Sequence, residues 1–584
     1  MGDAINDASE TVHEFTLKDS PAENQRRLRV VVIGAGFSGI CTAIRISQRL
    51  RNIDLAVYEA NPEPAGVWWL NRYPGLACDI PSYSYQFSFA PNPYWSSLYA
   101  PGPEIRAYMQ DVAERFGATR HIKTSHKVTS GTWDGEKKLW KLVVLNLETG
   151  ESFEDTANIL ISAKGGLNQI SWPKIKGLKS FGGKLMHSGA WDEDFDLRNK
   201  RVGIIGNGSS AIQIVPAIQP LEGLKLSCFA RSPTWIASSF GDRVMVKLGM
   251  DPKNSKFTRR HQEYMARFPE RYQEIRKMIE DDGATIYPIT LQGTEEQIGA
   301  KAAFEAGMRQ RLEGREDLIE PMIPKFAAGC RRLTPGPGYL EALKQENVDF
   351  ITTPIQEVTP EGIKLTAGDE VKLDVLICAT GYDLEAPPTF ELVGRNGTTL
   401  ANKWKPHFES YISMAVDEFP NFFIIGGPNS SLGSGSLTSV FEAQANYAVK
   451  VIRKMQKEDY STIEPKKERV NDFSQYIDEY FKGTVYTDEC SSWYRAGKLG
   501  TRIVALWPGS SAHCLEILRS PRWEDFNYES ADKTGNHLRW MGNGWSVTLT
   551  EGDPSWFLDE DVVDVPDEGE PENSKFYKNR PFSH

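Results

Sequence analysis

Three glycines close to the start of the chain have the spacing of a phosphate-binding turn. Gly34, Gly36 and Gly39 follow the apolar run VVVI and precede residues with helical periodicity. In a strand–turn–helix unit, such glycines permit a tight turn and let backbone N–H groups approach a pyrophosphate. Glu59 ends the next apolar strand, where a carboxylate accepts hydrogen bonds from ribose hydroxyls. A glycine turn kept only for packing is the alternative. We predict that the contacts of a first dinucleotide are Gly34, Gly36, Phe37, Ser38, Gly39 and Glu59.

A second glycine turn follows the apolar run VGII. Gly206 and Gly208 repeat the first two glycine positions, and Ala211 takes the third, where close helix packing is required. No acid ends the next strand. Arg231 stands there instead, and a guanidinium would pair bidentately with a 2′-phosphate. The turn therefore favours NADP over NAD, the alternative being an arginine that simply faces solvent. The predicted contacts are Gly206, Asn207, Gly208, Ser209, Ser210, Ala211, Arg231 and Ser232.

Two dinucleotide units in one chain are an arrangement that passes a hydride from NADPH to a flavin. We therefore predict FAD in the first unit and NADPH in the second. Disulfide reductases share this arrangement, but they need a cysteine pair beside the flavin. Cys41, near the first turn, has no partner close in sequence. That class of enzyme is therefore disfavoured.

His187 lies between the two units, in the run FGGKLMHSGAWD. On its chemistry alone it could be a general base, a metal ligand or a hinge contact. No second ligand stands at metal-binding spacing around it, so we predict no metal site. Its position favours a hydrogen-bonded linker that couples the orientation of the two units. The run resembles the F-x-G-x-x-x-H-x-x-x-W-[P/D] fingerprint of type I Baeyer–Villiger monooxygenases, with Asp in the rarer form of its ending, and the matching residues are Phe181, Gly183, His187, Trp191 and Asp192.

The resemblance to this family extends over residues 28–525. The run GVWWLNRYPG, residues 66–75, looks like the family's flavin-covering segment, because aromatic rings and glycines can cover an isoalloxazine. An aromatic core cluster is the alternative. The resemblance implies further flavin contacts at Val67, Trp68, Trp69, Ala77, Cys78, Asp79, Tyr85 and Val128.

Arg332, in the run CRRLTP, matches the active-site arginine of the family. Two adjacent arginines otherwise indicate a solvated surface. The resemblance implies that Asp79 faces Arg332 near the flavin and holds that cation in place, so these two residues are the predicted catalytic pair, and Arg332 is also a predicted cofactor contact. Arg331 would assist Arg231 and Ser232 on the phosphate of NADP.

The chemistry that the resemblance implies is the insertion of oxygen beside a ketone carbonyl. NADPH reduces the flavin, O2 adds to give a C4a-peroxyflavin, and the peroxide attacks the ketone to give an ester or lactone. The expected partners are O2 and a hydrophobic ketone, such as a polyketide or terpenoid product of secondary metabolism. An N- or S-oxygenating flavin monooxygenase and a flavin-binding scaffold without turnover are the alternatives.

These motifs predict the α/β fold class, with two dinucleotide-binding, Rossmann-like domains and a helical insertion in the second. The insertion, and the loops near 430–440 and 485–510, are expected to shape the substrate pocket. The predicted divisions are a disordered tail (1–27), the first part of the FAD domain (28–165), the first part of the NADP domain (166–238), the insertion (239–325), the second part of the NADP domain (326–373), the second part of the FAD domain with the C-terminal segment (374–558), and an acidic tail (559–584).

The composition of the 584-residue chain fits a multidomain globular protein with 40% hydrophobic and 25% charged residues. A net charge of -11 gives no attraction to nucleic acid or to an anionic membrane. Seven scattered cysteines predict no disulfide framework and a reducing compartment. The longest uncharged run, residues 30–44, is too short for a membrane span, and no export or lipid signal is visible, so we expect a cytoplasmic protein.

Overall fold

The computed structural model describes residues 15–22, 25–237, 240–251, 254–383, 389–495, 502–551, 553–555 and 558. The chain divides into two compact units. The larger comprises Arg27–Arg453 and Ser461–Glu529, and it contains both predicted dinucleotide turns. The smaller takes its described residues from Met1–Arg26, Lys454–Tyr460 and Ser530–His584. The predicted acidic tail, 559–584, lies outside the described residues.

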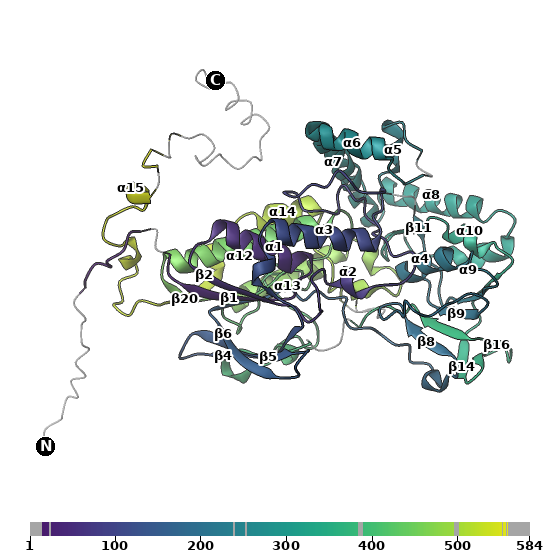
Figure 1. Ribbon diagram of the computed structural model, residues 1–584, viewed down its shortest axis with the longest axis horizontal. Helices are drawn as coiled ribbons and strands as arrows, with labels where there is room; N and C mark the ends of the chain where they lie inside the picture. Colours follow the sequence, from purple (N-terminus) through teal and green to yellow (C-terminus); the bar gives the residue numbers. More distant parts are fainter. Residues whose placement is uncertain are drawn as a thin grey trace. The chain divides into compact units, whose positions relative to one another are not determined.

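The first dinucleotide turn belongs to a five-stranded parallel sheet. The strands read as continuous apolar runs because both faces of the sheet are covered. Helix α1 (Phe37–Arg49) covers one face, and a four-stranded sheet packs against the other (Figure 1). In spatial order the strands are β19 (Phe422–Ile424), β7 (Ile159–Ser162), β1 (Leu28–Ile33), β2 (Ile53–Tyr58) and β3 (Ile122–Lys123).

The four-stranded sheet supplies the aromatic part of the core below the first turn. Trp133 and Trp140 pack edge to face, and Trp140 donates a hydrogen bond to the carbonyl oxygen of Pro420 at 2.9 Å. Burial of these rings against β1 and β7 fixes the sheet on which the turn is mounted. The strands are β18 (Glu391–Val393), β4 (His126–Asp134), β5 (Leu139–Asn146) and β6 (Ser152–Ala157).

The second dinucleotide turn belongs to another five-stranded parallel sheet and opens helix α4 (Ser209–Ile218). The prediction that residues from 374 onward return to the FAD domain is wrong at its start. Strand β17 pairs with β8 and β9, because its apolar sequence VLIC is buried in this second sheet. The strands in order are β13 (Val348–Ile351), β10 (Lys225–Phe229), β9 (Arg201–Ile205), β17 (Val375–Cys378) and β8 (Lys184–His187).

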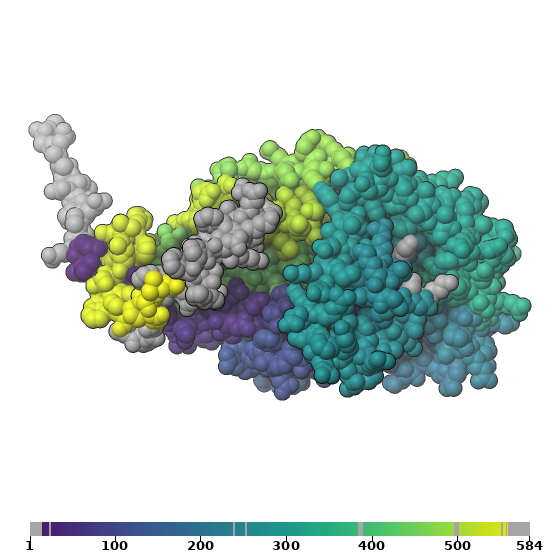
Figure 2. All heavy atoms as spheres, turned by 90° about the horizontal axis from the view of Figure 1, so that it is seen from above, coloured from purple at the N-terminus to yellow at the C-terminus, as the bar shows by residue number. Residues whose placement is uncertain are grey.

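The predicted insertion is helical, and it packs on the second sheet's core. Met308 and Leu312 of the insertion join the same buried cluster as Ile212 of α4 and Leu340. Figure 2 shows the insertion, in teal, as one continuous region of the surface. Its helices are α5 (Asp242–Lys247), α6 (Arg259–Arg267), α7 (Pro269–Ala284), α8 (Glu295–Arg311) and α9 (Ile319–Met322).

The C-terminal third adds helices around the first sheet. The apolar run RIVAL, residues 502–506, forms only an isolated bridge between Leu506 and Ser431. The run is held instead by loop contacts, such as the amide of Asn429 on the carbonyl oxygens of Ile503 and Leu506. The regular elements here are α12 (Leu437–Lys457), β20 (Tyr460–Pro465), α13 (Lys467–Phe481), α14 (Ser511–Leu518) and β21 (Phe526–Ser530).

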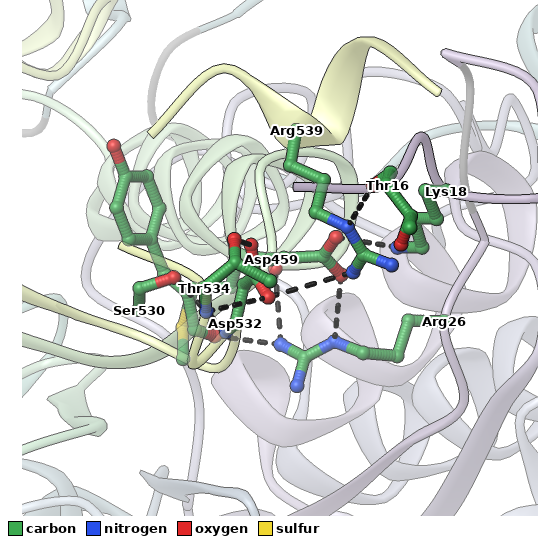
Figure 3. A network of polar contacts seen from close by, with 10 residues as sticks. Thr16, Lys18, Arg26, Asp459, Ser530, Asp532, Thr534 and Arg539 are labelled. Atoms are coloured by element: carbon green, nitrogen blue, oxygen red, sulfur yellow. Dashed lines mark hydrogen bonds and ion pairs between the residues drawn. The ribbon is translucent and has the colours of Figure 1, made fainter. Parts of the chain in front are cut away.

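The smaller unit contradicts the prediction of a disordered tail over 1–27 for the residues that are described. Asp459 forms ion pairs with Lys18 and with Arg26, whose Nε lies 3.8 Å away (Figure 3). Arg539 donates to the carbonyl oxygen of Thr16 at 2.8 Å and pairs with Asp532 at 3.4 Å. Residues 16, 18 and 26 therefore belong to one polar network with residues 532 and 539, although they lie at opposite ends of the sequence.

Two of the seven cysteines form a disulfide, Cys330–Cys490, which corrects the expectation drawn from their spacing. The partners are separated by 160 residues, so no local pattern could reveal the pair. Cys41, Cys78, Cys228, Cys378 and Cys514 are free and buried. Among the described residues, no helix combines the length and the apolar character needed to cross a bilayer.

Gly39 is required by packing, and its replacement tests this fold. A Cβ at residue 39 would lie 1.9 Å from the carbonyl oxygen of Gly34. We expect Gly39→Ala to lower the free energy of unfolding by about 2 kcal/mol, which would be measured as a lower urea midpoint. Gly299→Ala, in α8 where a Cβ meets open space, is the control and should add about 0.5–1 kcal/mol. Equal midpoints for both variants would contradict the described turn.

Candidate active site

The first glycine turn is shaped by backbone contacts that exclude side chains. Gly34 has a φ of +101°, and a Cβ there would meet the carbonyl oxygen of Ala163 at 2.7 Å. Ser38 donates to that same oxygen at 3.2 Å. Gly36 caps α1 without any side-chain hydrogen bond, so the first N–H groups of the helix are available to an anion.

Glu59 lies at the end of β2 beside this turn, as the sequence predicts. It is buried, and its Oε2 accepts from the backbone N–H of Ala35 at 2.6 Å. Its Oε1 accepts from the backbone and side-chain amides of Asn61 at 2.8 and 2.7 Å. These bonds hold the carboxylate at the turn, and Oε2, which accepts one bond, keeps a lone pair for a hydroxyl group.

The aromatic segment packs directly on the first turn. A Cβ on Gly66 would lie 3.1 Å from the Cα of Gly36, so the two backbones approach at glycines from both sides. Helix α2 (Val67–Leu70) follows, and the indole of Trp68 donates to the hydroxyl of Tyr85 at 3.2 Å. The ring of Phe37 packs edge to face on that of Tyr85, with the ring centroids 5.0 Å apart. The structure therefore brings Phe37, Trp68 and Tyr85 together beside the glycines.

Two other predicted flavin contacts have different surroundings. The ring of Trp69 contacts two cations, the guanidinium groups of Arg72 at 4.4 Å and of Arg106 at 5.4 Å from the ring centroid. The side chain of Val128, in β4, is buried in the core between the two sheets of the first domain. The side chain of Val128 is therefore a core side chain of this domain.

The second turn repeats the geometry of the first. Gly206 has a φ of +118°, and a Cβ there would meet the carbonyl oxygen of Ala379 at 2.4 Å. Gly208 caps α4 without a side-chain hydrogen bond and faces open space, and Ala211 is fully buried. The amide of Asn207 donates to the carbonyl oxygen of Ser232 at 2.7 Å, which ties the turn to the end of β10.

Arg331 lies next to Ser232 and Arg231, as predicted. One of its guanidinium nitrogens donates to the hydroxyl of Ser232 at 2.9 Å and another to the carbonyl oxygen of Pro233 at 3.2 Å. Its Nε is buried without a hydrogen-bond partner. Burial lowers the pKa of Arg331, and the positive charge of Arg231 lowers it further. Two cations therefore lie close together, and one of them has an unused donor, which suits this site to a phosphate.

Arg332 and Asp79 form a bidentate ion pair. The Nε and one Nη of Arg332 donate to the two carboxylate oxygens of Asp79 at 3.1 and 2.9 Å. Both side chains are largely buried. Burial alone lowers the pKa of Arg332, but the carboxylate of Asp79 outweighs burial, so the pKa is raised overall. The guanidinium is therefore charged and held in one orientation.

The segment that carries Asp79 is fastened to the second domain through α4. Tyr73 donates to the side-chain oxygen of Gln213 at 2.9 Å, and the amide of Gln213 donates to the carbonyl oxygen of Ala77 at 2.9 Å. A Cβ on Gly75 would lie 2.4 Å from the carbonyl oxygen of Gln213. Cys78, the residue between Ala77 and Asp79, is buried, which raises the pKa of its thiol.

The predicted linker residues lie apart from the ion pair, at the second sheet. His187 is fully buried at the end of β8, where its Nδ1 accepts from the N–H of Gly189 at 3.0 Å and its Nε2 lies 3.4 Å from the hydroxyl of Thr380. Burial lowers the pKa of His187. Asp192 pairs with Lys184. Phe181 and Trp191 pack in apolar clusters, and a Cβ on Gly183 would meet the carbonyl oxygen of Asp374 at 2.4 Å.

A cavity of about 30 Å³ lies at Arg332. Its walls combine five stretches of the chain, at residues 80–84, 240–241, 279–286, 332–333 and 433–435. Residues 279–286 come from the insertion, as expected, and residues 433–435 come from one of the expected loops. The apolar side chains of the wall include Ile80, Phe240, Ile279 and Leu333, and its carboxylates are Glu280 and Asp282.

Gln213 belongs to this site, although no sequence pattern predicted it. Its side chain bridges Tyr73 and Ala77. No spacing pattern marks this residue, because each contact is made by a single polar group across the fold. Among the described residues, no group of three metal-ligating side chains is present.

Comparisons with known proteins agree with this geometry. The model of an NAD(P)-binding Rossmann-like domain matches residues 32–101. The FAD-binding monooxygenase tazF of Aspergillus terreus is 36% identical over 545 residues, which are 92% of this chain and 96% of that protein. A Baeyer-Villiger monooxygenase of Streptomyces coelicolor is 34% identical over 494 residues, 83% of this chain and 89% of that protein.

A solved structure is similar over nearly its whole length. It is an oxidized steroid monooxygenase bound to NADP, with a TM-score of 0.72 and 28% identity over 86% of this chain and 99% of that chain. The two glycine turns, the paired Arg332 and Asp79, and these relatives lead to one conclusion. The chain belongs to the Baeyer–Villiger family of FAD-binding monooxygenases, which are flavin- and NADP-dependent oxidoreductases.

Proposed function

We propose that this chain inserts one oxygen atom from O2 beside the carbonyl of a ketone, giving an ester or a lactone, and that Arg332 is the residue that stabilises the reacting oxygen. The observation that carries the proposal is the ion pair of Arg332 with Asp79 at the wall of the cavity. FAD, when bound and reduced by NADPH, supplies the activation of O2. The residues of the chain bind the two dinucleotides, orient the reacting groups and neutralise the negative charge of the reacting oxygen.

The first turn fits FAD. The uncapped N-terminus of α1 at Gly36 offers N–H groups to the pyrophosphate, and the fixed carboxylate of Glu59 can accept from ribose hydroxyls. Trp68 and Tyr85 lie beside the turn, where their rings would cover the isoalloxazine. Further proposed contacts lie in the glycine turn and in the aromatic segment that follows it, namely Phe37, Ser38, Gly39, Val67, Trp69, Ala77 and Cys78.

The second turn fits NADPH. Its pyrophosphate would lie at the open N-terminus of α4, beside Gly208. The buried and unpaired Nε of Arg331, with Arg231 close by, would receive the 2′-phosphate. An anion there relieves the repulsion between the two guanidinium groups, which gives NADPH an advantage over NADH.

Arg332 would act as a fixed positive charge. A guanidinium stays protonated at any working pH, so it can stabilise an anionic oxygen without taking part in proton transfer. Asp79 acts through Arg332, because its two oxygens are already used in holding the guanidinium. The ion pair would therefore hold the positive charge of Arg332 in one fixed orientation.

The substrate that this cavity favours is a hydrophobic ketone. Apolar side chains line most of the wall near Arg332. A cavity of about 30 Å³ holds roughly two water molecules, so a ketone enters only if the insertion or residues 433–435 shift. The insertion would then determine which ketones are accepted.

Removal of the Arg332 guanidinium should separate NADPH oxidation from ester formation. We expect Arg332→Ala to bind FAD and oxidise NADPH, but to form ester about 100-fold more slowly or not at all, because the reacting oxygen loses its counter-charge. Mass spectrometry with a panel of cyclic ketones and a thioether measures the products directly. Arg198→Ala, which breaks an exposed pair with Asp196, is the control. Undiminished ester formation by Arg332→Ala would remove this residue from the mechanism.

Arg231→Ala tests the assignment of the 2′-phosphate. The KM for NADPH should rise about 10- to 100-fold, the effect of losing hydrogen bonds to a charged group. The KM for NADH should stay nearly constant, because NADH has no phosphate at this position. Steady-state NADPH and NADH oxidation gives both values. An equal change for the two nucleotides would show that Arg231 does not contact the phosphate.

A further inference from the structure

The two halves of the insertion contact different parts of the chain. Helices α8 and α9 carry Met308 and Met322, which belong to the buried cluster on the second sheet. Helices α6 and α7 contact residues 83–99 instead, and the amide of Gln262 in α6 donates to the carbonyl oxygen of Trp95 at 3.0 Å. Helix α3 (Gly102–Arg115) follows that stretch and contacts α1, the helix of the first glycine turn. The first half of the insertion is therefore attached to the part of the chain that carries the first turn.

Tyr272 makes the central contact of α7 with this stretch. Its hydroxyl donates to the carbonyl oxygen of Asn92 at 2.6 Å and accepts from the side-chain amide of Gln86 at 2.9 Å. Its ring packs edge to face on that of Tyr83, with the ring centroids 4.7 Å apart. Tyr272 and Gln86 are both buried, so the loss of either partner would leave a polar group without a hydrogen bond and away from water.

The amide of Gln86 uses its full capacity for hydrogen bonds. Its nitrogen donates to Tyr272 and to the carbonyl oxygen of Tyr83 at 2.8 Å. Its Oε1 accepts from the N–H of Asn92 at 2.7 Å and from the indole of Trp95 at 3.2 Å. An amide that makes all four of its hydrogen bonds has one orientation available to it. The hydroxyl of Tyr272 therefore meets a partner that is itself fixed.

Arg276 makes a second contact one helical turn after Tyr272. Its Nε donates to the carbonyl oxygen of Tyr83 at 3.2 Å, and one Nη lies 3.5 Å from the carbonyl oxygen of Ser88. Residues four positions apart lie on the same face of a helix. Helix α7 is therefore held to residues 83–92 at two successive turns.

The buried face of α7 also forms a wall of the cavity at Arg332. The buried residues of this helix are Tyr272, Ile275 and Ile279, at the spacing of one helical face. Ile279 lines the cavity, and residues 280–286 continue the wall. Ile279 lies about 10 Å from Tyr272 along the helix axis, because each residue of an α-helix advances by about 1.5 Å. A contact that fixes Tyr272 therefore also fixes where this wall stands.

We propose that Gln86 and Tyr272 are positioning residues that fix α7, and that the wall formed by this helix limits how bulky a ketone the site accepts. The inference rests on the proposed function, because it concerns the substrate of that reaction. Neither side chain belongs to the described wall of the cavity, so both act through Ile279 and the residues after it. A fixed wall excludes a bulky substrate, whereas a wall that can shift admits it.

Hydrogen exchange of the purified full-length protein tests the positioning of α7 without any ketone. We expect Tyr272→Phe to speed exchange over residues 276–286 by up to about tenfold, the effect of one lost hydrogen bond. Peptides of α8 should exchange as in the parent protein, because α8 packs on the second sheet. Tyr264→Phe, at an exposed tyrosine of α6, is the matched control. Unchanged exchange over 276–286 would overturn the proposal.

Arg276→Met tests the same attachment and leaves the buried hydrogen bonds of Gln86 intact. Methionine keeps an apolar stem at this position but cannot donate to the carbonyl oxygen of Tyr83. Exchange over residues 276–286 should again be faster than in the parent protein. Arg271→Met, which breaks an exposed pair with Glu274, is the matched control and should match the parent. Equal rates in Arg276→Met and the parent would count against the proposal.

Ketone selection separates failure of this inference from failure of the proposed function. We expect Tyr272→Phe to raise kcat/KM for 4-phenylcyclohexanone relative to cyclohexanone by about threefold to tenfold, through the KM of the ketones. The KM for NADPH should not change, and Tyr264→Phe should keep the ratio of the parent protein. If Arg332→Ala abolishes the ester and Tyr272→Phe keeps the parent's ratio, only the role of α7 is wrong. If Arg332→Ala has no effect on the ester, the proposed function of Arg332 is itself wrong.

Discussion

The ion pair between Arg332 and Asp79 is the interaction on which the arrangement of this site depends. A largely buried guanidinium cannot discharge by losing its proton, so it needs a carboxylate close by. Asp79 comes from the segment that follows the first glycine turn, whereas Arg332 comes from the chain after the insertion. The pairing of these two charges therefore sets the distance between two parts of the fold that are proposed to bind different dinucleotides.

The contacts around the ion pair also hold these parts of the fold together. Gln213 ties α4 to the backbone beside Asp79, and Arg331, adjacent to Arg332, reaches Ser232 at the end of β10. The two glycine turns place uncapped helix N-termini in the two sheets. One arginine thus faces the proposed NADPH phosphate while its neighbour faces the cavity, which connects nucleotide binding with the position of the reacting group.

The sequence predicted the parts of this structure that local patterns determine. The glycine turns, the carboxylate of Glu59 and the helical insertion follow from spacing and periodicity, and the pair of Arg332 with Asp79 followed from resemblance to a family. Strand β17 was assigned to the wrong domain, because an apolar run of four residues does not indicate which sheet will bury it. The Cys330–Cys490 bond joins residues 160 positions apart, and no sequence period reports such a contact.

The most direct test of the central claim is a crystal structure of the protein with FAD and NADP+ bound. The account predicts that Arg332 remains paired with Asp79 and that the free edge of its guanidinium lies against the isoalloxazine ring and faces the cavity. A structure in which Arg332 keeps its pair with Asp79 but is separated from the ring by other side chains would contradict it.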